Sequence, residues 1–302
     1  MKRTIVFLMA ALFLFAAAGC QKQEPAGGSS DVPPVSKFDT SKAVKVITRE
    51  EGSGTRGAFI ELMGIEQKDA DGNKVDMTTV EADTTNSTSV MMTSVAGNPY
   101  AIGYISLGSL NDTVKAVQVD GVEATVANVK AGTYKVARPF NVAVKEEGLS
   151  DLAKDFLAFI QSAEGQKVIT DAGYVSVVDD AKAYSGTKPE GKIVVAGSSS
   201  VTPVMEKLKE AYLAVNTNAS IEVQQSDSST GMSSAIAGSC DIGMASRELK
   251  DSELAKGLTP VTIAMDGIAV VVNNENPAEE LSSEQIKEIF LGNVDSWKEI
   301  LG

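Results

Sequence analysis

Short runs of β-branched and apolar residues alternate along the chain with segments whose apolar positions repeat at helical spacing. The clearest helix is predicted over 203–215. Its apolar residues fall on one face, namely Val204, Leu208, Ala211, Tyr212 and Val215. The other predicted elements are helices at 56–63, 229–237 and 283–291 and strands at 43–48, 192–196, 221–225 and 267–272. Alternation of this kind predicts an α/β fold.

The first twenty residues have the pattern of a secretory signal peptide. Lys2 and Arg3 precede an unbroken apolar run of fourteen residues, 5–18, and small residues then lead to Cys20. At ~1.5 Å per residue the run reaches about two-thirds of a ~30 Å hydrocarbon core, so a permanent membrane span is the weaker interpretation. We expect a signal peptide at 1–19 and lipidation of Cys20, which resembles a bacterial lipobox. Ordinary cleavage that leaves Cys20 as a free thiol is the alternative.

Residues 21–42 are rich in Gly, Ser, Pro and charged residues and show no apolar periodicity. This composition is typical of a flexible linker, so we expect a tether over 20–40 that lies outside the fold. A second connection, 184–191, is interrupted by Gly, Pro and Ser. Roughly 260 residues remain after the tether, which is enough for two domains with well-formed cores.

The composition excludes several classes of function. The net charge is −13 and no run of Lys or Arg is present, so nucleic acid and anionic lipid surfaces are poor partners. Histidine is absent, which weakens any hydrolase or metalloenzyme interpretation. If Cys20 carries lipid, Cys240 is the remaining thiol and no intramolecular disulfide can form. We expect no metal and no cofactor.

Two loops carry the candidate chemistry, and each runs from a predicted strand through Gly, Ser and Thr residues into a predicted helix. They span 46–57 and 195–203. Helix-start N–H groups carry partial positive charge, glycine admits a ligand close to the backbone, and hydroxyls add donors. A third polar run, 225–231, also precedes a helix. Each alone is an ordinary capped loop, but together they predict an anion site of mostly neutral donors, with Arg49 as its charged donor.

Two other interpretations of these loops are weaker. Gly52, Gly54 and Gly57 fit a dinucleotide-binding fingerprint, but no acidic residue clearly ends a second strand about twenty positions on. A serine hydrolase needs a base beside its nucleophile. Without histidine the base would be a lysine or a carboxylate, and neither serine-rich loop has a nearby lysine of obvious purpose.

At these residues the sequence resembles the phosphate-binding proteins of bacterial phosphate ABC importers, the PstS family. The matching strings are 48–59, 96–104, 197–203 and 241–247. The resemblance implies a two-lobed, type II periplasmic-binding-protein-like fold with two crossover strands that closes over one dehydrated phosphate. It also implies a lipid-anchored, monomeric binding protein on the outer face of the cytoplasmic membrane. Such a protein hands phosphate to permease subunits and is not an enzyme.

The resemblance also implies the site. Its phosphate-binding residues would be Arg49, Ser53, Gly54, Thr55, Ser199, Ser200, Ser228, Ser246 and Arg247. Glu51 would orient Arg49. Some family members hold a carboxylate at the position of Arg247, where it accepts the proton of hydrogen phosphate and so penalises sulfate. Asp227 is the candidate replacement for that acceptor. Binding of another oxyanion such as sulfate, phosphate sensing without transport, and a surface phosphatase or esterase are the alternative functions.

The order of the strings departs from the family. The Gly-Ser-Ser-Ser loop usually comes first, and the loop of Arg49 follows a segment like 295–300, which here ends the chain. We interpret this order as a circular permutation whose old ends are bridged by 179–191; a truncated or misassembled gene is the alternative. Permutation predicts a continuous lobe at 140–273 and a discontinuous lobe formed by 41–139 and 274–302.

Overall fold

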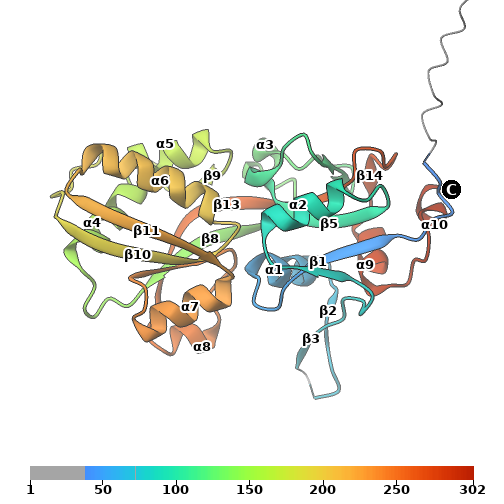
Figure 1. The fold of residues 1–302 in the computed structure, drawn as a ribbon, viewed down its shortest axis with the longest axis horizontal. Coiled ribbons are helices and arrows are strands. Elements are labelled where there is room, and N and C mark those ends of the chain that lie inside the picture. The colour runs from blue at the N-terminus through green and yellow to red at the C-terminus, as the bar shows by residue number, and fades with distance from the viewer. Residues whose placement is uncertain (1–37, 72) are drawn as a thin grey trace, which may run out of the picture. The chain divides into compact units, whose positions relative to one another are not determined.

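The computed structural model describes residues 38–71 and 73–302 (Figure 1). The expected signal peptide, the lipidation site at Cys20 and most of the expected tether lie outside the described residues. The helices are α1 (Gly54–Leu62), α2 (Thr88–Ala96), α3 (Val126–Lys130), α4 (Asp151–Ile160), α5 (Ala163–Asp171), α6 (Thr202–Val215), α7 (Ser228–Ala237), α8 (Asp251–Leu254), α9 (Ser283–Leu291) and α10 (Trp297–Leu301), with a 3-10 turn η1 (Leu107–Ser109).

The strands are β1 (Lys45–Arg49), β2 (Glu66–Lys68), β3 (Lys74–Asp76), β4 (Asp83–Thr85), β5 (Ala101–Ser106), β6 (Lys115–Ala116), β7 (Gln118–Val119), β8 (Ala137–Val144), β9 (Val175–Ser176), β10 (Gly191–Ser198), β11 (Ala219–Ser226), β12 (Ile242–Ala245), β13 (Thr259–Val272) and β14 (Glu280–Leu281). The main sheet has the order β11-β10-β12-β8-β13-β5-β1-β4. At one end β10, β11 and β12 pair in parallel, and at the other β1 pairs in parallel with β4 and β5. The α/β fold is confirmed.

Two antiparallel strands run through the middle of this sheet. β8 and β13 pair from Thr259 opposite Val144 to Gly267 opposite Ala137, with a register shift between Thr262 and Ala264. β13 sends Ile263 and Ala264 into one buried core and its last residues into another. The same pair of strands therefore belongs to both halves of the sheet (Figure 1).

Each half has its own apolar core. Phe59, Tyr104 and Phe290 are at the centre of one core, and Phe156 and Tyr212 at the centre of the other. We call the part around Phe59 the first lobe (β1–β7, β14, α1–α3, α9 and α10) and the part around Phe156 the second lobe (β10–β12 and α4–α8). Because β8 and β13 pass through both, the chain divisions expected at 139/140 and 273/274 stay a prediction.

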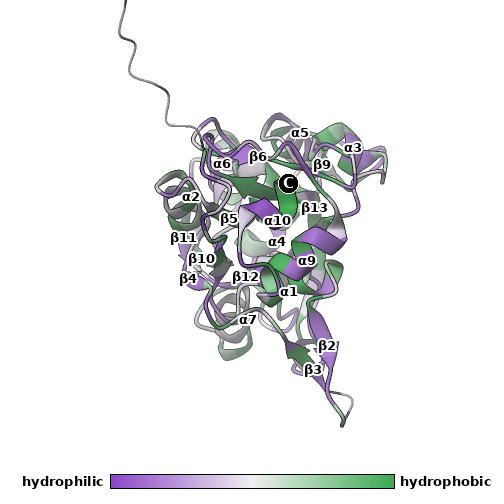
Figure 2. Cartoon of the chain, turned by 90° about the vertical axis from the view of Figure 1, so that its right-hand side faces the viewer, coloured by the Kyte–Doolittle hydropathy of each residue, from purple (hydrophilic) through white to green (hydrophobic). Residues whose placement is uncertain are grey.

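The eight predicted elements are all present, but one was predicted too short. The strand expected at 267–272 begins at Thr259, eight residues earlier. Pro260 and Asp266 interrupt its apolar pattern, although the backbone continues to pair with β8 through both positions. The other predicted ends agree with the structure within two residues, and α9 spans 283–291 as expected, with Ile286, Ile289 and Phe290 buried on its apolar side (Figure 2).

The expected tether was drawn too far into the chain. Phe38 packs against Tyr100 and Trp297, with ring centroids 5.0 and 6.1 Å away. Trp297 donates its backbone N–H to Lys42 O at 3.2 Å and its indole N–H to Tyr100 O at 3.0 Å. An aromatic side chain in an otherwise polar segment gains from such burial. The first described residues therefore belong to the fold and lie beside the C-terminal helix (Figure 1).

Candidate functional site

The three predicted loops meet where the two lobes touch. The loop after β1 leads into α1, and the loops after β10 and β11 lead into α6 and α7. Because β10, β11 and β12 run parallel, their carboxyl ends lie at one edge of the second lobe. Ligands of open α/β sheets bind at such edges. Ser229 donates its backbone N–H to Gly52 O at 3.2 Å, which joins this edge to the loop of the first lobe.

Seven buried hydroxyl groups gather there and are called the hydroxyl cluster: Thr55, Thr88, Ser198, Ser199, Ser200, Ser228 and Ser246. Thr55 Oγ1 lies 2.8 Å from Ser200 Oγ and 3.3 Å from Ser246 Oγ, so hydrogen bonds join the lobes. Ser246 Oγ also lies 3.0 Å from Ser198 Oγ and 3.5 Å from Ser228 Oγ. Five members were predicted as site residues from the sequence. Thr88 and Ser198 were not.

Arg49 is directed into the hydroxyl cluster. Its side chain is 3% exposed, and Nη2 donates to Ser199 Oγ at 3.0 Å while Nη1 lies 3.5 Å from Thr88 Oγ1. Its other donors, Nε and Nη2, bind Glu50 at 2.7 and 2.6 Å. The prediction that Glu51 orients Arg49 is therefore wrong. Glu50 stays beside β4 through its N–H bond to Thr85 O, whereas Glu51 falls in the exposed turn at Gly52.

Ser53 and Gly54 frame the start of α1. The Ser53 hydroxyl accepts from Arg56 N at 3.3 Å and caps the helix, so its hydroxyl oxygen faces the helix start. Gly54 lies against the opposite lobe. A Cβ atom at Gly54 would be 2.4 Å from Ser228 Oγ and 2.8 Å from Ser246 Oγ. Only glycine permits the lobes to approach this closely, as expected of a residue lining a closed site.

Arg247 is not directed into the hydroxyl cluster. Its Nη1 and Nη2 atoms bind both carboxylate oxygens of Glu253 at 2.9 and 2.8 Å, and the guanidinium also donates to Glu248 O and Ser229 Oγ. Burial would raise the pKa of Glu253, but the bonds from Arg247 and the Lys250 N–H hold it below its usual value. The guanidinium therefore forms a strong ion pair at the rim of the site.

The carboxylate of Asp227, the candidate acceptor, caps α7. Its two carboxylate oxygens accept from Thr230 N at 2.9 Å and Thr230 Oγ1 at 2.5 Å, which caps α7. The carboxylate lies against Gly52 of the other lobe, where a Cβ would be 2.7 Å from Oδ1. Asp227 thus contacts the loop of the first lobe, but its hydrogen bonds stay within α7.

Arg138 is a third residue at the hydroxyl cluster that was not predicted from the sequence, after Thr88 and Ser198. It is 3% exposed, lies on β8, and donates from Nη2 to Thr55 Oγ1 at 3.0 Å and from Nε to Ser246 O at 3.1 Å. Its Nη1 donates to Asp266 Oδ2 at 2.6 Å. The signal was available in the sequence, because Arg138 and Asp266 are single charges within apolar strands and buried charges are rare unless paired.

The arrangement offers a ligand mainly hydrogen-bond donors, namely seven hydroxyls with two buried guanidinium groups beside them. Among residues 38–71 and 73–302, no lysine nitrogen or carboxylate oxygen hydrogen-bonds to a member of the hydroxyl cluster, so no base is placed to activate a nucleophile. No group of three or more acidic, Cys or His side chains suited to a metal occurs in that part of the chain either. Nor does any of its helices have the length and apolar character needed to span a bilayer.

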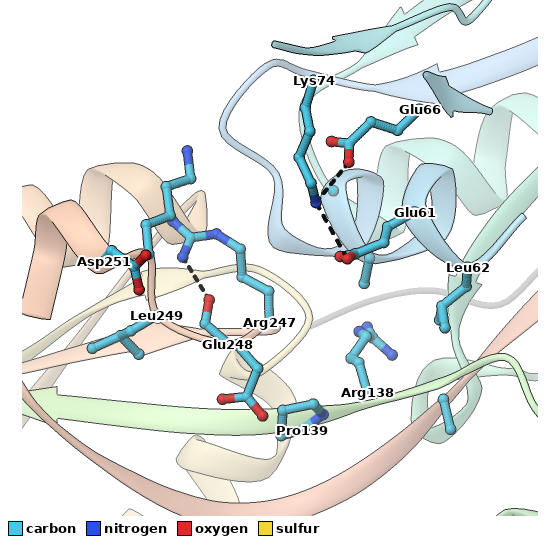
Figure 3. A pocket seen from close by; sticks show the side chains of 14 residues that line it. Glu61, Leu62, Glu66, Lys74, Arg138, Pro139, Arg247, Glu248, Leu249 and Asp251 are labelled. Carbon is cyan, nitrogen blue, oxygen red and sulfur yellow. Dashed lines mark hydrogen bonds and ion pairs between the residues drawn. The ribbon is translucent and has the colours of Figure 1, made fainter. Parts of the chain in front are cut away.

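A groove of about 600 Å³ opens beside the cluster between the two lobes (Figure 3). Glu61, Glu66 and Lys74 of the first lobe line one side, and the segment 247–251 of the second lobe lines the other. Lys74 pairs with both glutamates at 3.3 and 2.8 Å, so its charge is neutralised. Arg138 lines the groove and donates to Thr55, so it connects the groove with the hydroxyl cluster.

Comparison with known proteins agrees with this geometry. Residues 30–164 and 182–302 match the family model described as a PBP superfamily domain. The chain is 54% identical over 275 residues to phosphate-binding protein PstS 2 of Streptococcus agalactiae, covering 91% of this chain and 92% of the relative. It is 45% identical over 265 residues to PstS 2 of Streptococcus pneumoniae, covering 88% and 90%. A crystal structure of a phosphate-binding protein of a phosphate ABC transporter from S. pneumoniae superposes with a TM-score of 0.68 at 44% identity, covering 85% of this chain and 99% of that one.

Proposed function

The chain belongs to the PstS family of phosphate-binding proteins, and on that premise we propose that it captures inorganic phosphate outside the cytoplasm and delivers it to the permease of an ABC importer. The observation that carries the proposal is the convergence of seven buried hydroxyls and the Arg49 guanidinium from two lobes. In the proposal, the site residues are the hydroxyl cluster, Arg49, Ser53 and Gly54.

The donors suit a tetrahedral oxyanion. Ser and Thr hydroxyls each carry one donor hydrogen that rotates, so each can turn from a neighbouring hydroxyl to an anion oxygen. The guanidinium adds charge-assisted hydrogen bonds, which are roughly twice as strong as neutral ones. Closure of the lobes removes water and strengthens every one of these interactions. A small ion therefore gains from the site even though the whole chain carries a net charge of −13.

Selectivity against sulfate rests on acceptors. Hydrogen phosphate brings a P–OH that needs an acceptor, whereas sulfate brings none at neutral pH. A carboxylate acceptor penalises sulfate because two acceptors would then face each other. Asp227 is held within α7, and the hydroxyls, which accept as well as donate, are the remaining acceptors. Sulfate binding is thus the second candidate, favoured by the engagement of Asp227.

Calorimetric titration of the purified chain without its proposed signal peptide tests the function. We expect saturable binding of inorganic phosphate at one site per chain, and weaker binding of sulfate in competition. If phosphate gives no binding heat and does not raise the melting temperature, phosphate capture is refuted. If sulfate binds more tightly than phosphate, the second candidate, sulfate binding, is selected. The same preparation is expected to leave a chromogenic phosphate ester unhydrolysed, which separates a binding protein from a surface phosphatase or esterase.

The position of the protein in the cell and the order of its segments complete the proposal. We propose that Cys20 carries the lipid anchor, which mass spectrometry of the protein from membranes would reveal.

We also propose that the segment order is a circular permutation. One observation supports it, since Phe38 packs against Trp297 beside the C-terminus. The 275-residue alignment to the S. agalactiae relative runs through 91% of this chain, so that relative has the same segment order, which argues against a misassembled gene. New ends that lie together at the surface are what a permutation requires.

A further inference from the structure

A buried ion pair joins the two strands that the lobes share. Arg138 on β8 and Asp266 on β13 face each other in register, and their side chains are 2% and 1% exposed. The distance between Nη1 and Oδ2 is 2.6 Å. Taking two charges out of water is costly, and an apolar pair of similar volume is often as stable, so a buried pair is weak evidence for a stabilising role. The pair calls for an explanation in function.

The hydrogen bonds of Arg138 reach both lobes. Nη2 donates to Thr55 Oγ1 in the first lobe, and Nε donates to Ser246 O in the second. Asp266 accepts from Nη1 of Arg138 and, through Oδ1, from Gly108 N at 3.2 Å. These bonds hold the guanidinium between the lobes, at the point where the hydroxyl cluster joins them.

One donor of Arg138 remains. A guanidinium has five N–H groups, and four of those of Arg138 are engaged by Ser246 O, Asp266 Oδ2, Gly267 O and Thr55 Oγ1. Within the described part of the chain, the second N–H of Nη2 has no hydrogen-bond partner. Nη2 itself lies 3.0 Å from Thr55 Oγ1, whose hydroxyl bonds Ser200 and Ser246. The remaining donor thus lies at the hydroxyl cluster.

Resting on the proposed function, we propose that Arg138 is a second guanidinium that contacts the bound anion, and that Asp266 positions it. The arrangement repeats that of Arg49, where Glu50 binds Nε and Nη2, while Nη2 also donates to Ser199 and Nη1 faces Thr88. In both pairs a carboxylate fixes the orientation of the planar guanidinium. The arginine side chain therefore loses less conformational entropy when the anion binds. The anion would then meet one arginine from the first lobe and one from the connecting strands.

Burial and mutual attraction have opposite effects on the pKa values of Arg138 and Asp266. Burial lowers the pKa of Arg138 and raises that of Asp266, and each group opposes the shift of the other. Arg138 stays protonated at neutral pH because a guanidinium does not lose its proton in proteins. Arg138 therefore supplies a positive charge at the junction of the lobes at neutral pH.

Two matched double variants and one single variant test the assignment: Arg138→Gln/Asp266→Asn, Arg247→Gln/Glu253→Gln at the rim, and Asp266→Asn alone. Each double variant neutralises one arginine–carboxylate pair. We expect phosphate affinity to fall about 10- to 100-fold for the Arg138 pair, the scale of a lost hydrogen bond to a charged group. The rim pair should stay within about threefold of the parent, because Glu253 already occupies the terminal nitrogens of Arg247. Asp266→Asn should lower the affinity less than the double variant does, because the Asn side chain still accepts from Arg138.

The outcomes separate this inference from the function on which it rests. If the parent does not bind phosphate, the proposed function fails. If the parent binds and the Arg138 double variant, shown to be folded by circular dichroism, binds equally well, the pair is a structural link only and the inference alone is overturned. The inference is also overturned if Asp266→Asn loses as much affinity as the double variant, because the carboxylate would then be the essential group.

A conservative variant covers the case in which the double variant does not fold. Arg138→Lys keeps the charge beside Asp266 but loses the planar fork, so the remaining Nη2 donor is lost. We expect it to melt near the parent and to bind phosphate about 10-fold more weakly. Unchanged phosphate affinity in this variant would overturn the inference.

Discussion

Arg49 and Arg247 have similar positions in the sequence but different hydrogen-bond partners in the structure. Arg49 ends β1, Arg247 stands two residues after β12, and both belong to strings that resemble the same family. Arg49 is bound by its neighbour Glu50, which leaves Nη1 and Nη2 to face Thr88 and Ser199. Arg247 is bound through both terminal nitrogens by Glu253 of α8. Arg247 also lines the groove (Figure 3).

The difference shows what decides the role of an arginine in such a site. A matching string fixes where the backbone lies, but the partner carboxylate fixes where the guanidinium points. Glu50 binds one edge of the Arg49 fork, so the other edge is available to a ligand. Glu253 takes the two terminal nitrogens of Arg247, the edge that a bidentate oxyanion would use.

Neutralising the Arg49 pair should have the largest effect. In Arg49→Gln/Glu50→Gln, the buried guanidinium is lost without leaving Glu50 unpaired. We expect phosphate affinity to fall about 100-fold or more, because the bound phosphate loses Arg49 as its charged partner. Removing one partner of such a buried charge pair costs about 2–5 kcal/mol in binding. Calorimetry measures the loss, and the melting temperature in the absence of phosphate serves as the control for folding. A folded variant that binds like the parent would remove Arg49 from the site.

The sequence allowed the place of the site to be predicted, and for a physical reason. Hydroxyl-rich loops that follow parallel strands must meet at one sheet edge, because parallel strands end together. The three loops predicted one anion site, and the family resemblance assigned Thr55, Ser199, Ser200, Ser228 and Ser246 to it. These five residues lie within one hydrogen-bonded cluster. Local pattern and family resemblance both carry this kind of information.

The partners of the charged residues could not be predicted in the same way. Glu50 and Glu51 are neighbours, and only the pairing of Glu50 with β4 decides which of them reaches Arg49. Arg138 meets Asp266 across 128 residues of chain and Thr55 across 83. Such contacts depend on strand register and lobe packing, which no local pattern specifies.

Gly54 lies against the second lobe close to Arg247, and its replacement should have the next largest effect. A Cβ in Gly54→Ala would be 2.4 Å from Ser228 Oγ and 3.1 Å from Arg247 Cγ, so the lobes could not close fully. We expect phosphate affinity to fall about 10-fold, while the unliganded chain is at least as stable, because alanine favours helix over glycine by about 1 kcal/mol.

Gly57→Ala is the matched control for this prediction. Gly57 is in the same helix, and nothing lies within 4 Å of its added Cβ. It should raise the melting temperature without weakening phosphate binding. Equal affinities of the two variants would show that the lobes do not approach at Gly54 when phosphate is bound.

Tyr104 holds the backbone of Arg49, so its loss should affect affinity moderately. The Tyr104 hydroxyl accepts from Arg49 N at 3.1 Å and lies 2.8 Å from Thr48 Oγ1. Tyr104→Phe leaves the buried Arg49 N–H unpaired, which costs about 1–3 kcal/mol in stability. We expect affinity for phosphate to fall a few-fold. Tyr134→Phe, which removes a buried hydroxyl bonded to Ile268 O, should lower stability and leave affinity unchanged.

Tyr104 also predicts part of the stability that the folded chain loses at alkaline pH. Burial raises the pKa of Tyr104 to about 12, although its bonds to Thr48 and Arg49 N oppose the shift. Since the folded pKa exceeds the unfolded value of about 10, the protonated phenol contributes stability below about pH 10 that is lost as the pH rises toward 12. Urea unfolding at pH 8 and pH 11 should therefore show a smaller alkaline loss in Tyr104→Phe than in the parent. An equal loss would assign the effect to the other buried tyrosines.

Neutralising the Arg247 pair should have the smallest effect on binding, and it decides the comparison. In Arg247→Gln/Glu253→Gln the ion pair at the rim is lost, but Arg49 and the hydroxyl cluster keep their contacts. We expect phosphate affinity within about threefold of the parent, because Glu253 already occupies the terminal nitrogens that an anion would bind. A loss close to that of the Arg49 pair would mean that phosphate displaces Glu253 from Arg247. Position in the matching string, and not the carboxylate partner, would then determine which arginine binds the anion.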